Sequence, residues 1–351
     1  MISYHNIDIK SLTLEELENF LTDLGEKKYR AVQIFDYLYK KGLYSFSHMM
    51  RLPKATREIL KSKCHIYKAR IIEKKNARED TTEKYLIRLE DNNLIETVLI
   101  RQAPRRNTLC VSTQVGCRYR CSFCASGLGG FVRDLRVSEI TEQLLLIIKS
   151  LSADSIHNVV FMGMGEPLDN LPNVIRSIKI INSKHAFTIG MRKITVSTCG
   201  LADKIKELIG SAITPELSIS LHAPDDDTRD MLMGINKKFN IKALIAAARE
   251  YTTKTKRLVT FEYILIKNVN DSPLQAQKLS LLLKNVPCKV NFIVYNEVKP
   301  LPYERPTALV LRNFCAVLKK NNTPFTVRAS RGEAVDAACG QLRLRQGQKN
   351  V

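Results

Sequence analysis

Residues 108–124 read TLCVSTQVGCRYRCSFC, and they are the most informative part of the sequence. It opens with a strand-like apolar run, Leu109–Ser112, and continues into a loop that holds Cys117, Cys121 and Cys124. Three thiolates spaced in this way can surround one face of an iron–sulfur cubane. Three protein ligands leave one iron without a side chain, and a substrate can bind at such an open metal position. The stretch therefore predicts a catalytic [4Fe-4S] cluster.

A structural zinc site is the main alternative for these cysteines. Structural zinc usually takes four protein ligands, commonly as two close pairs. The sequence contains no second Cys-x-x-Cys pair that could complete such a site. Three cysteines that merely fill a core would be a coincidence in so polar a loop, so the cluster is the favoured interpretation.

Strand-like and helical patterns alternate along the chain after residue 108. A helix is expected over Glu139–Lys149, with Ser138 as its N-cap. Such alternation is typical of βα units and a parallel sheet. Six units are too few for the usual eight-fold closed barrel, so we expect an α/β fold with a partly open (β/α)6 barrel. The expected strands are Leu109–Ser112, Asn158–Met162, Lys193–Thr198, Glu216–Leu221, Val259–Ile266 and Val290–Val294.

Two smaller units precede this barrel. Residues 1–66 predict a helical domain, in which Thr13 and Glu16 have the spacing of a capping box. Further helices are expected over Tyr29–Lys41 and after Pro53. Residues 67–106 show a period of two, with Asn92-Asn93 as a hairpin turn, and predict a short antiparallel β bridge. The barrel is then expected over residues 107–342, followed by a basic tail over 343–351.

The charge balance predicts a polyanionic partner. Lys and Arg total 55 against 35 for Asp and Glu, which gives a formal net charge of +20. Such an excess attracts polyanions, and nucleic acid is the commonest one in cells; the alternative is that the excess only maintains solubility. No apolar run is long enough for a membrane span, and the first residues do not resemble a secretory signal. We therefore expect a cytoplasmic protein with no membrane partner, in which the 9 cysteines serve as ligands, catalytic thiols or core residues.

The loop C-x-x-x-C-x-F-C, with Phe123 before the last cysteine, resembles that of the radical S-adenosylmethionine (SAM) superfamily. The segment GMGEP at 163–167 is similar to the glycine-rich segment of that superfamily, which holds the methionine part of SAM. Taken alone, any tight turn could produce these glycines, and His222 alone could be an ordinary core histidine. The resemblance implies SAM contacts at Gly165, Glu166, Ser197, Ser220, Leu221, His222 and Asn296.

Residues 108–117, the segment DAACGQL at 336–342 and the Leu12–Leu60 region resemble the RlmN/Cfr group of radical SAM RNA adenine methyltransferases. This resemblance covers nearly the whole chain. It implies methylation of C2 or C8 of an adenine in 23S rRNA, and for RlmN also in tRNA (the adenosine 2503 and adenosine 37 types of site). Pro167 within GEPL favours the C2 enzymes over Cfr, which tends to carry Ala there.

The same resemblance assigns catalytic roles to three residues. Cys339 would accept a methyl group from one SAM, and a second SAM would generate the radical that activates this S-methylcysteine. Cys110 would resolve the RNA adduct and close a disulfide with Cys339, which external thiols reduce. Glu96 is the candidate proton acceptor, although an exposed strand carboxylate is the simpler interpretation of its sequence context. A one-electron reductant such as flavodoxin is also implied.

Two alternative functions remain open from the sequence. A non-catalytic RNA-binding protein with a structural zinc explains the charge and three cysteines, but not Cys339 or the glycine segment. A radical SAM enzyme with a protein or small-molecule substrate is disfavoured by the basic charge. Ala334 and the loop over 297–305 depart from the usual RlmN pattern. Packing roles are expected for the remaining cysteines, which are Cys64, Cys199, Cys288 and Cys315.

Overall fold

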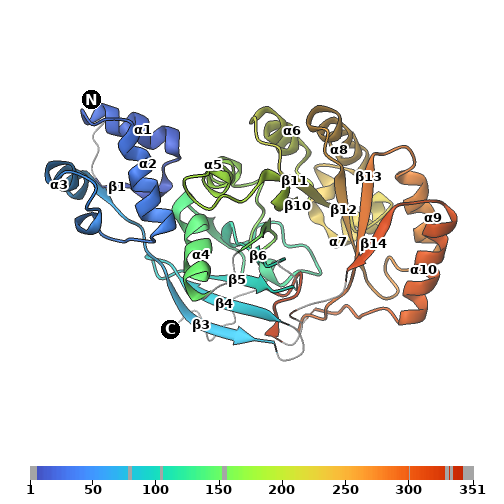
Figure 1. Cartoon of the computed structure of the whole chain (residues 1–351). Helices are drawn as coiled ribbons and strands as arrows, with labels where there is room; N and C mark the ends of the chain where they lie inside the picture. The colour runs from blue at the N-terminus through green and yellow to red at the C-terminus, as the bar shows by residue number, and fades with distance from the viewer. Residues whose placement is uncertain are drawn as a thin grey trace.

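A ten-stranded mixed sheet organises the protein, whose computed structural model describes residues 6–77, 81–102, 106–151, 156–299, 301–328, 332 and 335–342 (Figure 1). The strand order is β14-β13-β12-β11-β10-β9-β6-β5-β4-β3. The bounds of these strands are β3 Arg70–Asn76, β4 Thr82–Arg88, β5 Leu94–Ile100, β6 Thr108–Cys110, β9 Asn158–Phe161, β10 Ile194–Thr198, β11 Glu216–Ser220, β12 Val259–Leu265, β13 Cys288–Val294 and β14 Phe325–Arg328.

The part of this sheet from β6 to β14 is parallel, and helices connect its successive strands. The six expected strand–helix units are present, and the sheet order has two ends, so the prediction of a partly open barrel is confirmed. Strand β14 was missed because four residues with a half-exposed pattern carry little strand signal. The helices that cover the outer face of the sheet are α4 Val137–Ser150, α5 Leu171–Asn182, α6 Ala202–Gly210, α7 Asp226–Leu232, α8 Ile241–Thr255, α9 Pro273–Leu282 and α10 Ala308–Lys320.

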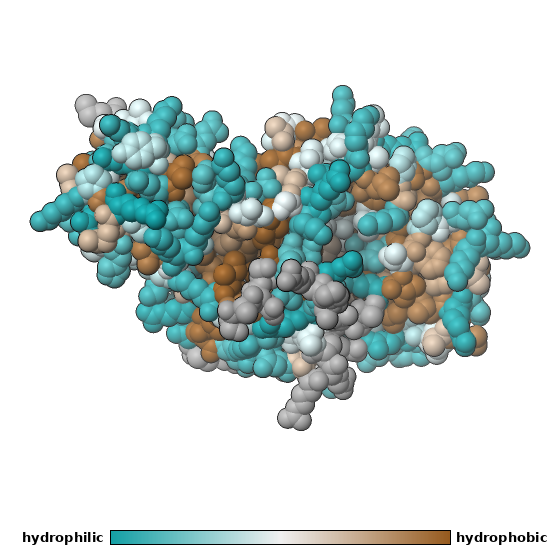
Figure 2. All heavy atoms as spheres, viewed as in Figure 1, coloured by the Kyte–Doolittle hydropathy of each residue, from teal (hydrophilic) through white to brown (hydrophobic). Residues whose placement is uncertain are grey.

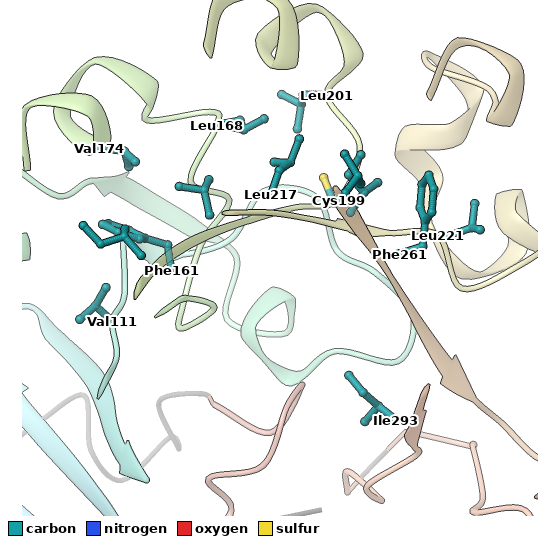
Figure 3. Packing of buried hydrophobic residues seen from close by; sticks show 14 of the residues in the cluster. Val111, Phe161, Leu168, Val174, Cys199, Leu201, Leu217, Leu221, Phe261 and Ile293 are labelled. Carbon is teal, nitrogen blue, oxygen red and sulfur yellow. The ribbon is translucent and has the colours of Figure 1, made fainter. Parts of the chain in front are cut away.

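The main hydrophobic core fills the layer between the strands and these helices. Figure 3 shows Leu168, Leu201 and Leu217 in this layer, with Ile293 on the opposite side of the strands. Successive strand residues face opposite sides of a sheet, so the apolar positions that bury into the helix layer leave their neighbours facing the interior of the barrel. That interior is where polar and reactive side chains gather.

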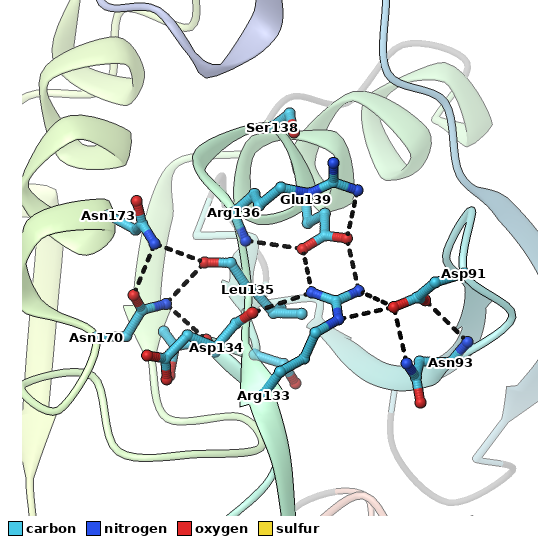
Figure 4. A network of polar contacts seen from close by, with 12 residues as sticks. Asp91, Asn93, Arg133, Asp134, Leu135, Arg136, Ser138, Glu139, Asn170 and Asn173 are labelled. Carbon is cyan, nitrogen blue, oxygen red and sulfur yellow. Dashed lines mark hydrogen bonds and ion pairs between the residues drawn. The ribbon is translucent and has the colours of Figure 1, made fainter. Parts of the chain in front are cut away.

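Helix α4 begins at Val137, and Ser138 is therefore inside the helix rather than at its N-cap as expected. The Glu139 carboxylate explains the difference, because it accepts a hydrogen bond from the backbone N–H of Arg136 at 2.7 Å. The same carboxylate binds Arg133, which also reaches Asp91 in the β4–β5 turn (Figure 4). This network joins α4 to the strand that precedes it and to the antiparallel strands.

The expected antiparallel strands are present as β3, β4 and β5, and they extend the barrel sheet. Strand β5 pairs with β6, with Val98 opposite Cys110. The expected hairpin turn is confirmed, since Asn92 has a φ of 65° between β4 and β5. This continuity carries the interior face of the barrel onto β5.

The N-terminal helices form a second packed unit, which lies at one end of the molecule in Figure 1. They are α1 Leu14–Asp23, α2 Tyr29–Phe35, which continues as a π-helical turn over Asp36–Lys40, and α3 Lys54–Lys63. The capping box of Thr13 and Glu16 is confirmed. Strands β1 Ile7–Asp8 and β2 Cys64–His65 pair in parallel beside these helices. Figure 2 shows hydrophilic side chains over much of this unit, as expected for a chain so rich in charge.

A buried ion pair joins the N-terminal unit to the barrel. The Lys10 ammonium binds the Glu142 carboxylate on α4 at 2.5 Å, and both side chains are almost fully buried. Tyr44 donates a hydrogen bond of 2.7 Å to the same carboxylate. Burial lowers the pKa of Lys10, although Glu142 opposes this effect. Among the described helices, none has the length and apolar character needed to cross a bilayer.

Replacing Lys10 tests this junction. Lys10→Met leaves the Glu142 carboxylate buried without its cation, so we expect a loss of about 3–5 kcal/mol in the free energy of unfolding. Denaturant unfolding followed by circular dichroism measures the change. Lys61→Met is the matched control, because the Lys61–Glu58 pair is exposed and should contribute at most about 1 kcal/mol. Equal effects of the two substitutions would contradict the importance of the buried pair.

Candidate active site

Two neighbouring cavities lie in the interior of the barrel. The upper cavity, at the carboxyl ends of the parallel strands, encloses about 900 Å³ including space open to solvent. The sulfur cavity, between β5, β6, β13 and β14, encloses about 540 Å³ on the same measure. Cys339 lines both cavities. The other predicted site residues that line the upper cavity are Cys117, Cys121, Cys124, Gly165, Glu166, Ser197, Ser220 and His222.

The loop that carries three of these cysteines begins at a small two-stranded sheet, β7 Gln114–Gly116 with β8 Phe131–Asp134. Gly116 has a φ of 78°, and a Cβ there would lie 1.9 Å from the carbonyl oxygen of Gly130, so the position requires glycine. The backbone N–H of Cys117 donates to that same carbonyl at 3.0 Å. The local backbone thus directs the loop toward the carboxyl ends of the strands.

The three thiols of this loop fit a cationic iron–sulfur cluster. Burial raises the pKa of Cys117 to about 12 and raises the pKa values of Cys121 and Cys124 as well. Neighbouring thiolates add to each shift, so three anions here need a compensating cation, which a coordinated metal supplies. No three His, Cys, Asp or Glu side chains among the described residues converge on one metal ion. In a four-iron cluster each cysteine binds a different iron, so its ligands surround a group and need not converge on a point.

The glycine-rich segment follows β9 and approaches the cavity closely. Gly165 has a φ of 100°, and its ideal Cβ would lie 2.5 Å from the Cβ of Gln114. Glu166 accepts hydrogen bonds from the backbone N–H groups of Cys199 at 2.7 Å and Leu168 at 3.0 Å. Burial is the largest influence on Glu166 and raises its pKa to about 7. This carboxylate is therefore held rigidly beside the cavity, where a cationic ligand would favour its ionised form.

His222 is a neutral side chain at the end of β11. Burial and the charge of Arg229 lower its pKa to about 3. Its Nδ1 accepts a hydrogen bond from the backbone N–H of Ile264 at 3.1 Å, so Nε2 carries the proton. The ring packs edge-to-face against Phe123, with 4.9 Å between ring centroids. His222 thus offers a hydrogen-bond donor and supports the cysteine loop.

Arg229, on α7, holds two strand ends together from outside the cavity. Its fully buried guanidinium donates to the carbonyl oxygens of Cys199 at 2.7 Å and Ser220 at 3.0 Å. It also donates to the carbonyl of Leu221 at 3.1 Å. The Leu221 side chain lies in the core of the helix layer and lines neither cavity, because Leu221 alternates with the inward-facing Ser220.

Two residues that line the upper cavity, Glu262 and Cys199, were not predicted as site residues. Glu262, on β12, lines the cavity and accepts hydrogen bonds from Asn291 at 2.7 Å and Ser218 at 3.2 Å. A lone carboxylate within the apolar run of β12 was the available signal. Cys199, for which only packing was expected, is indeed buried in the core but also lines the cavity.

The sulfur cavity brings Cys110, Cys339 and Asn296 together. Cys110 ends β6, and burial together with the nearby Cys339 thiol raises its pKa to about 12. Asn296 follows β13, is buried, and accepts a hydrogen bond from Arg305 at 3.3 Å. Arg328, at the end of β14, also lines this cavity and was not predicted. Cys110 and Cys339 lie far apart in the sequence, near the first and last residues of the expected barrel, and the fold brings them to one cavity.

The segment that carries Cys339 fills the open side of the barrel. Its Ala337 and Leu342 side chains join a small core with Val98 and Cys110. The backbone N–H of Ala125 donates to the carbonyl of Gly340 at 2.7 Å. On the other side, Gln341 donates to the carbonyl of Glu297 at 3.1 Å. These contacts fix residues 335–342 between the cysteine loop and the segment after β13.

Glu96 is buried, so the interpretation as an exposed strand carboxylate is wrong. Its carboxylate binds the Lys84 ammonium at 2.9 Å, and Lys84 donates to the carbonyl of Asp336 at 3.1 Å. Glu96 lines neither cavity, but it lies on the same face of β5 as Val98, which does. Its observed contacts position the Cys339 segment, and its role as proton acceptor stays a prediction.

Two parts of the sequence depart from the usual family pattern, Ala334 and the loop over 297–305. Ala334 lies outside the described residues. In the loop after β13, Tyr303 donates to the Ser122 hydroxyl at 2.8 Å, and Arg305 contacts Asn296. The loop therefore touches both the cysteine loop and the sulfur cavity.

Sequence comparisons agree with this geometry. The profile of the radical SAM superfamily matches residues 111–277, and that of the ribosomal RNA large subunit methyltransferase N-terminal domain matches residues 7–66. Two proteins described as probable dual-specificity RNA methyltransferase RlmN, from Clostridium novyi (strain NT) and Thermoanaerobacter sp. (strain X514), are each 43% identical over 336 residues. Each alignment covers 96% of this chain and 97% of the relative. This chain belongs to the RlmN family of radical SAM methyltransferases.

A solved structure extends the RlmN family assignment to the whole fold. The crystal structure of a radical SAM methyltransferase from Sphaerobacter thermophilus is 40% identical and superposes with a TM-score of 0.90. The match covers 96% of this chain and 99% of that one. The superfamily uses a [4Fe-4S] cluster and SAM, and the upper cavity, with three partly buried thiols and a buried carboxylate, has the donor set that such cationic groups require.

Gly163 provides a test of the close approach at the upper cavity. Its ideal Cβ would lie 2.6 Å from the carbonyl oxygen of Val111 and 2.7 Å from the backbone nitrogen of Ser112, neither of which can rotate away. We expect Gly163→Ala to lower the free energy of unfolding by about 1–3 kcal/mol. Gly190→Ala is the control, because nothing lies within 4 Å of its ideal Cβ. Denaturant titration measures both, and an unaffected Gly163→Ala protein would contradict the tight packing.

Proposed function

We propose that this protein methylates C2 of adenosine in 23S rRNA and in tRNA, and that the methyl group passes through Cys339. The observation that carries the proposal is that Cys339 lines both the upper cavity and the sulfur cavity. The relatives described as dual-specificity RNA methyltransferase RlmN support two kinds of RNA substrate. The formal charge of +20 supports a polyanionic partner.

The upper cavity would bind both cofactors. Cys117, Cys121 and Cys124 would hold the cluster, and the Glu166 carboxylate would accept hydrogen bonds from the SAM ammonium group. When bound, the cluster and SAM supply the one-electron chemistry that an unactivated adenine C–H requires. The hydroxyls of Ser197 and Ser220 and the Nε2–H of His222 line the rest of this cavity, where we expect them to orient SAM.

The sulfur cavity would carry the methyl group and release the product. The Cys339 thiolate would attack the methyl carbon of a first SAM and release S-adenosylhomocysteine, and a hydrogen atom would leave the resulting S-methyl group in the turnover of a second SAM. After the carbon joins adenine C2, Cys110 would form a disulfide with Cys339 and free the methylated base. The raised pKa of Cys110 keeps its thiol protonated at neutral pH, which disfavours premature disulfide formation.

Further partners follow from this chemistry. Each turnover would need an electron from a one-electron reductant such as flavodoxin and a thiol to reduce the Cys110–Cys339 disulfide. Glu96 remains our candidate proton acceptor near the adenine, although its carboxylate would have to exchange its contact with Lys84.

Nucleoside analysis after incubation with 23S rRNA fragments and tRNA tests the proposal. We expect 2-methyladenosine from the wild type and none from Cys339→Ala, because the methyl carrier is lost. Cys315→Ala is the matched control, since Cys315 lies on α10 and lines neither cavity. Formation of 8-methyladenosine alone would instead support a Cfr-like activity, and undiminished methylation by Cys339→Ala would exclude the carrier role.

The titration of Glu166 predicts a pH dependence of SAM binding. Because burial raises the pKa of this carboxyl to about 7, the unliganded protein gains a proton as the pH falls through 7. A neutral carboxyl loses its attraction for the ammonium, so SAM affinity should fall about tenfold from pH 8 to pH 6. Equilibrium dialysis with the cluster-loaded protein measures this. Glu166→Gln should bind SAM weakly with little pH dependence, and an unchanged pH profile in that variant would contradict the assignment.

A further inference from the structure

A third cavity opens at the opposite end of the barrel. This lower cavity lies among the first residues of the parallel strands, such as Thr108 in β6, Asn158 in β9 and Thr326 in β14. It encloses about 900 Å³ including space open to solvent. The upper cavity lies at the carboxyl ends of the same strands and shares Met162 and Glu262 with the lower cavity, and the two open toward opposite ends of the barrel.

The lower cavity is cationic. Arg192, Lys193 and Lys289 are exposed at its rim, and none of them forms an ion pair within the described part of the chain. Glu216, one of its two acids, is neutralised by Arg257 at 2.8 Å. The other acid is Glu262, whose pKa is raised by burial. Positive charge therefore dominates the opening, and it should concentrate small anions.

The lower cavity and the sulfur cavity share part of their lining among the described residues. Val160, Met162 and Arg328 line both. Methionine side chains are flexible and adapt to changes in packing, so the Met162 side chain can move and connect the two cavities. The Arg328 guanidinium makes no hydrogen bond or ion pair with another described residue, and it interacts electrostatically with Cys339, Glu262 and Cys110. The Arg328 cation thus stands between the basic opening and the two sulfurs.

We propose that the lower cavity admits a small anionic thiol that reduces the Cys110–Cys339 disulfide. This inference rests on the proposed function, which forms that disulfide in each turnover. The thiolate of the reductant attacks one sulfur of the disulfide, and the other sulfur leaves as a thiolate beside Arg328. A second reductant thiolate attacks the mixed disulfide and releases the remaining cysteine. In total, two reductant thiols are oxidised to one disulfide, and their two protons end on Cys110 and Cys339.

A separate entrance would let the reductant reach the disulfide while RNA occupies the upper cavity. The proposed RNA substrate would approach the upper cavity, at the carboxyl ends of the strands. A polyanion there would block a reductant sterically and would repel an anionic one. The lower cavity reaches the same two sulfurs from the other end of the barrel, past the Met162 side chain.

Reduction kinetics test the entrance. The cluster-loaded protein is oxidised mildly with diamide, and the peptide that links residues 110 and 339 is quantified by mass spectrometry during reduction. The reductants are 2-mercaptoethanesulfonate (anionic), 2-mercaptoethanol (neutral) and cysteamine (cationic), compared at equal thiolate concentration and low salt. We expect the anionic thiol to be at least about tenfold faster than the cationic one, which is the lower end of electrostatic rate enhancement.

Charge reversal at the rim identifies the route. Lys289→Glu should reduce the preference for the anionic thiol at least about threefold, whereas Lys284→Glu, an exposed lysine outside the cavity, should leave the preference unchanged. Saturating tRNA should slow reduction by 2-mercaptoethanesulfonate less than twofold in the wild type, because the lower opening stays accessible.

Three outcomes would overturn the inference. Equal rates for the three thiols, or equal effects of Lys289→Glu and Lys284→Glu, would exclude a cationic lower entrance while leaving the methyl-carrier function intact. Arrest of reduction by tRNA would show that the reductant enters from the upper cavity. Absence of any linked 110–339 peptide after oxidation would contradict both this inference and the resolving role of Cys110.

Discussion

The sulfur atom of Cys339 lines two cavities, and the arrangement of the open barrel makes this double contact possible. Cys339 lies where the upper cavity and the sulfur cavity meet, so a small movement of its side chain exchanges one set of neighbours for the other. A closed barrel would leave no room for such a residue to enter from the side. The sheet instead ends at β14 and β3, and the segment over 335–342 occupies the open side. Ser126 holds the far end of this segment by donating to the carbonyl of Leu342 at 2.7 Å.

The interior of the barrel and the surface of the protein differ in the sign of their charged groups. The chain has a large excess of positive charge, yet the upper cavity is lined by acidic groups, namely three thiols of the cysteine loop, Glu166 and Glu262. Burial makes each anion costly, which raises the pKa values of these groups in the absence of a ligand. A cationic cluster and the positively charged SAM would relieve that cost. The interior is thus prepared for cationic cofactors, and the basic exterior suits a polyanionic substrate.

The features that the sequence could predict are those encoded in local spacing. The cysteine loop, the capping box at Thr13 and the alternation of strands and helices each depend on residues close together in the chain. Features that depend on which face of the sheet a strand residue occupies could not be predicted. Leu221 follows an inward-facing residue and therefore faces the helix layer, while Glu262 faces inward and was missed. Glu96 was misjudged as exposed because its partner, Lys84, comes from the neighbouring strand.

Whether the methyl group travels through the sulfur at position 339 is the central question. Incubating the cluster-loaded protein with SAM labelled in its methyl group, followed by peptide mass spectrometry, answers it most directly. We predict that the peptide containing Cys339 gains the label before RNA is added and loses it when the RNA gains it. Label that reaches adenosine without ever residing on this peptide would exclude Cys339 as the methyl carrier.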